Sequence, residues 1–200
     1  MSKNILALRK VVKEFRKGNK PVNGKYVIND KEYAVRDEDA NIANLVLEAE
    51  KFVSDYIKEN GTTSFLSERL RDGFIGEEVH TDNGTTYVQT TRGKPYGTVA
   101  SIAVGDIIYC GTSYIAEEDK NCAFPVIGQY LALKKAIAFS KADGEFPKVK
   151  SKARKQFDHF VLRSKAFFFP DKYSYSRGSN PVDYPNYDEI KARRDKILGN

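Results

Sequence analysis

A run of residues in the middle of the chain constrains its fold more than any other feature, because its order predicts a strand, a turn and a helix. Residues 107–116 are β-branched and apolar, residues 117–121 are polar, and Pro125 suits the first turn of a helix that extends to about Ser140. Residues 79–81, 85–91 and 96–103 also read as strands, the first two flanking the tight-turn sequence 82–84. Four successive strands favour an antiparallel meander. We therefore predict an α+β fold, with a central antiparallel sheet over residues 75–116 flanked by helices.

The flanking segments supply the predicted helices. Apolar spacing predicts helices over residues 3–17 and 39–60, a short helix over 64–71, a helix around 149–168 and a last one over 188–198. Residues 25–36 alternate around Asn29 and Asp30, which indicates a hairpin. We expect one domain over residues 1–169 and a C-terminal aromatic arm with a short helix over 170–200. The aromatic residues of this arm suit either packing on the domain or contact with a partner.

The strand-turn-helix segment resembles a group of small uncharacterised phage-encoded proteins. In that group a strand ends in a Gly-x-Ser turn, an Asp follows, and a helix opens with Gly and carries small residues and a basic residue. The matching positions are Gly111, Ser113, Asp119, Gly128, Ala132, Lys135 and Ala136. The resemblance covers residues 104–138, and Lys134 and Lys135 stand where an arginine is more usual. It implies a phage origin but assigns no activity, and the same residues also suit a strand and helix packed closely at Gly128.

Basic residues are concentrated in two segments. Residues 1–20 hold seven basic residues against one acid, residues 148–177 hold nine against two, and residues 30–60 are acidic. Basic segments that contain aromatic residues are typical of surfaces that bind a phosphate backbone, although solvated faces of amphipathic helices have the same composition. If residues 148–165 form one helix and the first helix lies beside it, the two form one positive face. The predicted nucleic-acid or partner-binding residues are Lys10, Lys13, Lys17, Lys150, Lys152, Arg154, Lys155, Arg163, Tyr173 and Tyr175.

Catalytic patterns are weak in this sequence. Asp106, Glu118 and Lys120 follow the order of residues in some magnesium-dependent nucleases, but a strand of extended chain separates Asp106 from Glu118. The two cysteines, Cys110 and Cys122, are expected to be reduced thiols, and we predict no metal site and no cofactor. No run is long enough to span a membrane and no signal sequence opens the chain, so we expect a cytoplasmic protein.

Three classes of function remain open from the sequence. The favoured one is a non-enzymatic, phage-encoded accessory protein in the cytoplasm of the host cell. It would bind a host or phage macromolecule, either nucleic acid or an acidic protein surface, for example in host takeover or anti-defence. The alternatives are a virion or assembly component and a magnesium-dependent nuclease. The sequence does not indicate an oligomeric state.

Overall fold

The computed structural model describes residues 5–72, 74–80, 86–116, 124–141 and 147–175, and it confirms the α+β class. In chain order the elements are α1 (Ile5–Arg16), β1 (Lys25–Ile28), β2 (Lys31–Ala34), α2 (Asp37–Asn60), β3 (Phe65–Arg71), β4 (Phe74–His80), β5 (Thr86–Arg92), β6 (Pro95–Val104), β7 (Ile107–Tyr114), α3 (Pro125–Lys141) and α4 (Arg154–Phe168). The predicted helix over 188–198 and most of the C-terminal aromatic arm lie outside the described residues. The other predicted helices are confirmed in outline, except the one over 64–71.

A three-stranded antiparallel sheet, in the order β3-β6-β7, forms the centre of the molecule. The predicted extent of this sheet, residues 75–116, was wrong in two ways. The prediction left out β3, which forms one edge, and it included residues 74–92, which are not part of this sheet. The predicted helix over 64–71 was wrong for a physical reason. Leu66 and Leu70 suit one helical face, but Leu66, Glu68 and Leu70 also alternate with Phe65 and Ser67, and pairing with β6 stabilises the extended form.

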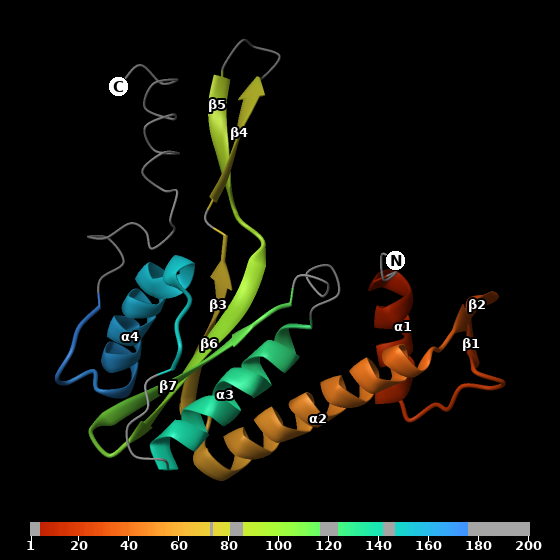
Figure 1. Cartoon of the computed structure of the whole chain (residues 1–200), viewed down its shortest axis with the longest axis horizontal. Helices are drawn as coiled ribbons and strands as arrows, with labels where there is room; N and C mark the ends of the chain where they lie inside the picture. Colours follow the sequence, from red (N-terminus) through yellow and green to blue (C-terminus); the bar gives the residue numbers. More distant parts are fainter. Residues whose placement is uncertain (1–4, 73, 81–85, 117–123, 142–146, 176–200) are drawn as a thin grey trace.

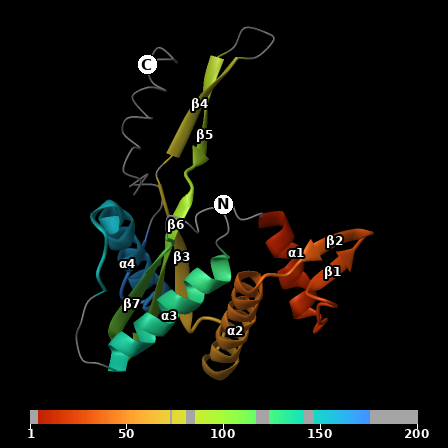
Figure 2. The same cartoon turned by 45° about the vertical axis from the view of Figure 1, so that its right-hand side comes forward.

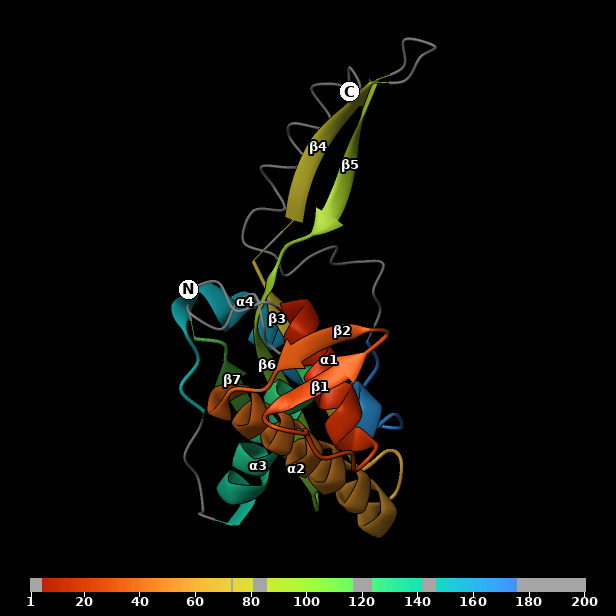
Figure 3. The ribbon, with the colours of Figure 1, turned by 90° about the vertical axis from the view of Figure 1, so that its right-hand side faces the viewer.

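The strands β4 and β5 form a separate hairpin that projects away from the sheet (Figures 1 and 3). Their register runs from Phe74 opposite Arg92 to His80 opposite Thr86. The ladder continues into the sheet, because the Asp72 amide donates to the Lys94 carbonyl at 3.0 Å and Arg71 lies opposite Pro95. The two strands of the hairpin are therefore extensions of β3 and β6.

Helices cover both faces of the sheet: α2 and α3 lie side by side on one face, and α4 lies on the other (Figures 1 and 2). The alternation of β6 divides its side chains between the two layers. Ala100 and Ile102 pack against α3, whereas Val99 packs against Phe157 and Phe160 of α4. The central strand is therefore buried on both faces.

The N-terminal elements extend the core along α2. Val11 and Val12 of α1 pack with Tyr26 of β1 and with the buried residues of α2. The predicted hairpin over 25–36 is confirmed, and its turn residues Asn29 and Asp30 both have positive φ, 51° and 57°, as a two-residue type I′ turn requires. This part of the chain lies on the opposite side of α2 from the sheet (Figure 1).

Glycines allow α3 to lie unusually close to the sheet. A Cβ added at Gly111 of β7 would lie 2.6 Å from the backbone nitrogen of Ala136, and closer still to the carbonyl oxygen of Ala132. A Cβ added at Gly128 of α3 would lie 2.5 Å from the Thr98 hydroxyl oxygen of β6. The expectation of close packing at Gly128 is confirmed, and these small residues are explained by the contact between helix and sheet.

Candidate nucleic-acid interface

The basic segment before α4 is only partly helical. Residues 147–150 are irregular, residues Ser151–Ala153 form a 3₁₀ turn, and α4 begins at Arg154, so the prediction of one helix over 148–165 was wrong at its start. The segment is held along β7, where the Lys150 amide donates to the Tyr114 hydroxyl at 3.0 Å. Burial of Phe157 and Phe160 against the sheet leaves the basic side chains exposed. We call Lys148, Lys150, Lys152, Arg154 and Lys155 the α4 basic cluster.

Two stacked tyrosines support this cluster. The rings of Tyr96 and Tyr114 are parallel, with an interplanar angle of 2° and centroids 6.4 Å apart. Lys152 Nζ lies 3.8 Å from the centroid of Tyr96, and Lys150 Nζ lies 4.7 Å from that of Tyr114. The Tyr96 side chain is only 3% exposed, so its ring is not free to stack on a base. The tyrosines instead hold the two lysines in place by cation–π contact.

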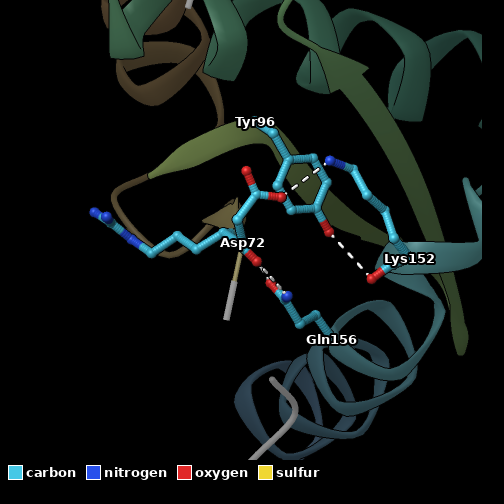
Figure 4. A network of polar contacts seen from close by, with 5 residues as sticks. Asp72, Tyr96, Lys152 and Gln156 are labelled. Atoms are coloured by element: carbon cyan, nitrogen blue, oxygen red, sulfur yellow. Dashed lines mark hydrogen bonds and ion pairs between the residues drawn. The ribbon is translucent and has the colours of Figure 1, made fainter. Parts of the chain in front are cut away.

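The cluster is also fixed to the base of the β4–β5 hairpin (Figure 4). The Gln156 side chain accepts a hydrogen bond from the Arg71 amide at 3.0 Å and donates one to the Arg71 carbonyl at 2.6 Å. Lys152 Nζ lies 3.0 Å from a carboxylate oxygen of Asp72, and the Tyr96 hydroxyl donates to the Lys152 carbonyl at 3.3 Å. Burial raises the pKa of Tyr96 to about 12, so its hydroxyl remains a hydrogen-bond donor at neutral pH.

Most of the cluster has no acidic partner among the residues that the structure describes. Lys152 pairs with Asp72, but within the described ranges Lys148, Lys150, Arg154 and Lys155 form no ion pair. The first turn of α4 contains no acidic residue, and its N-cap, Ala153, provides no side-chain hydrogen bond. Arg154 and Lys155 thus lie at the positive end of a helix dipole, where cations are unfavourable.

The predicted residues of α1 do not join this cluster. Helix α1 packs on α2 and β1, whereas α4 packs on the far face of the sheet, so the two helices are not neighbours and do not form one continuous positive face (Figures 1 and 2). Lys10 donates to the Tyr33 hydroxyl and Lys17 pairs with Glu14 at 2.8 Å. Lys13 is exposed and forms no ion pair with the described residues. The apolar side of α1 determines this separation, because it is buried against α2.

Of the three remaining predicted residues, Arg163 lies farther along α4, and Tyr173 and Tyr175 lie beyond its end. Arg163 pairs with Glu68 of β3 and lies 6.0 Å from the ring of Tyr175, so both residues take part in packing. Tyr173 is 46% exposed, and Lys165 Nζ lies 5.6 Å from its ring. Of the predicted set, the structure therefore brings together Lys150, Lys152, Arg154 and Lys155. Sequence reasoning missed Lys148 and the tyrosine pair, because only the sheet register brings Tyr96 near Tyr114.

The other candidate chemistry finds little support in the described residues. Asp106 lies in the exposed turn between β6 and β7 and pairs with Lys172 at 3.0 Å, while Glu118, Lys120 and Cys122 lie outside the described residues. Among the residues with a described position, no three His, Cys, Asp or Glu side chains are grouped to hold a metal ion. Cys110 is a free buried thiol whose pKa is raised to about 12 by burial. A thiol with this pKa is not a nucleophile at neutral pH.

Comparisons with protein-family models, with curated proteins and with solved structures found no match. No helix in the described part of the chain is both long enough and apolar enough to cross a membrane. The functional interpretation therefore depends on the geometry and charge of the described residues.

Proposed function

We propose that this protein is a non-enzymatic binding protein whose α4 basic cluster contacts the phosphate backbone of nucleic acid. The observation that carries the proposal is the group of four exposed cations, Lys148, Lys150, Arg154 and Lys155, that form no ion pair with described residues. In keeping with the sequence analysis, we place the protein in the cytoplasm of the host cell as a phage-encoded accessory factor.

Fold stability does not account for the composition of the cluster. Four like charges within eight residues repel one another, and two of them lie at the disfavoured end of α4. Each phosphate neutralised by a bound protein releases counterions, which makes such a surface favourable for a polyanion. Binding to a polyanion therefore stabilises the cluster, whereas in the free protein its charges repel one another.

The arrangement favours backbone contact over base recognition. Tyr96 is buried and Tyr114 is half-buried beneath Lys150, so among the described residues the cluster presents no exposed ring to stack on a base. Contacts to phosphates position a protein without reading sequence. We therefore propose binding with little sequence preference and with strong salt dependence. An acidic protein surface is the alternative partner for the same residues.

The proposal is tested by fluorescence anisotropy with short duplex DNA, duplex RNA and single strands at several salt concentrations. Engagement of four phosphates predicts a slope of about −3.6 for log affinity against log salt on duplex DNA. The triple variant Lys150→Glu, Arg154→Glu and Lys155→Glu should abolish binding, with the circular dichroism spectrum unchanged.

A matched control variant distinguishes binding by a local surface from an effect of net charge alone. Arg9→Glu, Lys13→Glu and Lys20→Glu change the net charge by the same amount on exposed positions of the N-terminal part. This variant should retain most of the affinity. Equal loss in both triple variants would show that net charge alone matters. Failure of the wild type to bind any nucleic acid at low salt would reject the proposal in favour of an acidic protein partner.

A further inference from the structure

A pocket of about 310 Å³ lies on the face of the sheet opposite α4. It is enclosed by the first halves of α2 and α3 and by the ends of β6 and β7 at the base of the β4–β5 hairpin. Its volume is near the lower end of the range for small-molecule sites, roughly 300–1,000 Å³. The pocket is therefore large enough for one small ligand.

Apolar side chains form most of the wall. Ile42 and Leu45 come from α2, whereas Ile127 and Leu131 come from α3, and Leu131 is 40% exposed. Gly97 of β6 and Gly128 of α3 contribute no side chain to the wall, and the Ser113 hydroxyl is occupied by a hydrogen bond to the Gly128 carbonyl at 3.1 Å. The wall thus offers apolar surface with few free polar groups.

Arg69 of β3 is the exception. It lies opposite Thr98 of β6 in the sheet register, and both residues line the pocket. Its side chain is exposed and forms no ion pair or hydrogen bond with the described residues. This differs from the arginines Arg16, Arg36 and Arg163, which pair with acids. A guanidinium beside an apolar pocket is complementary to a ligand that has an apolar body and one acidic group.

We propose that this pocket binds a small amphipathic anion, whose apolar group lies between Leu45, Ile127 and Leu131 and whose carboxylate, sulfonate or phosphate pairs with Arg69. The site is separate from the α4 basic cluster, which lies on the other face of the sheet. Binding at one site can therefore be lost without loss at the other.

Two fluorescent probes that share one ring system test the proposal. Anilinonaphthalene sulfonate carries an anionic group, and phenylnaphthylamine is its neutral counterpart. The wild type should bind the sulfonate at one site per chain, measured by fluorescence titration and calorimetry. Arg69→Gln should weaken the affinity for the sulfonate by about tenfold or more, as loss of a hydrogen bond to a charged group predicts. The same variant should leave the neutral probe within about twofold, because it interacts with the apolar wall alone.

Further variants locate the site. Ala116→Phe adds a ring at an exposed position on the pocket rim and should weaken both probes. If that variant does not fold, Leu131→Glu serves instead. It adds a negative charge at the mouth of the pocket and should weaken the affinity for the sulfonate more than the affinity for the neutral probe. The triple variant of the α4 basic cluster should bind both probes normally. The proposal is overturned if the wild type binds no sulfonate at a single site, or if Arg69→Gln and the rim variant leave its affinity unchanged.

Discussion

Replacing Gly111 with alanine should destabilise the fold strongly, because the added methyl group meets backbone atoms of α3. The Cβ would lie 2.6 Å from the Ala136 nitrogen, whereas ordinary contact begins near 3.4 Å. The helix must therefore move by at least the difference, 0.8 Å, or the strand must bend. Backbone atoms of a helix cannot rotate away as a flexible side chain can.

The expected cost follows from what α3 buries. Ala132, Leu133 and Ala136 are 0% exposed, and a radial gap of about 0.5–1 Å forfeits a quarter to a half of each dispersion contact. Overpacking a core costs about 1–3 kcal/mol, occasionally more, and the loss of unfolded-state entropy returns only about 0.4–1 kcal/mol. With the overpacking cost taken at the upper end of that range, we expect a net loss of about 2 kcal/mol in the free energy of unfolding.

Urea unfolding followed by circular dichroism measures this loss, and Gly105→Ala is the control. Gly105 has a φ of 58° and no atom within 4 Å of an added Cβ, so alanine there carries only backbone strain of about 1–2 kcal/mol. The double variant Gly111→Ala and Ala132→Gly should show no rescue, because the clash involves the Ala132 carbonyl and not its methyl group. A Gly111→Ala protein within about 0.5 kcal/mol of the wild type, or a rescued double variant, would refute this reasoning.

Three further predictions concern single contacts. Gln156→Ala should cost about 2–4 kcal/mol in urea unfolding, because it leaves the amide and the carbonyl of Arg71 unpaired. The buried hydroxyls of Ser101 and Ser164 lie 2.8 Å apart, and Ser164→Ala should cost about 1–3 kcal/mol because it strands Ser101. Ser101→Ala should cost less, since Ser164 retains its bond to a backbone carbonyl. The thiol of Cys110 has a pKa raised from 9.0 to about 12 in the folded protein, so the unfolded chain releases its proton first. Stability should therefore fall by about 1.4 kcal/mol per pH unit between these values, a slope from this group that Cys110→Ala removes.

Apart from the helix over 64–71, local patterns predicted the helices and two of the hairpins well, but not which strands belong to the sheet. Helix α2 has a long apolar face and ends before Gly61, and α3 begins at Pro125, so both follow from signals within the segment itself. The strand β3 is paired with β6, which lies across the whole β4–β5 hairpin in sequence. No local sequence pattern predicts that pairing, and the charged residues of β3 suit a helix equally well.

Prediction of the candidate interface was limited in the same way. The exposure of Lys150, Lys152, Arg154 and Lys155 followed from the apolar residues of α4, and the structure confirms it. The position of α1 could not be predicted from the sequence, because the charge of a segment does not indicate which neighbour its apolar side contacts. That Arg69 forms no ion pair with the described residues also depends on how distant parts of the chain are arranged. Charge balance at a site therefore became visible only with the tertiary structure.

The continuous ladder from β4–β5 into β3–β6 has a consequence for the order of folding. Residues 71 and 95 are far apart in sequence, and joining them directly would require closure of a long loop. If pairing starts at the end near His80 and Thr86, each successive pair closes only a minimal loop, until Asp72 meets Lys94. The projecting hairpin would then act as a zipper that turns a non-local contact into a local one, and the core sheet should form faster than its sequence separations suggest.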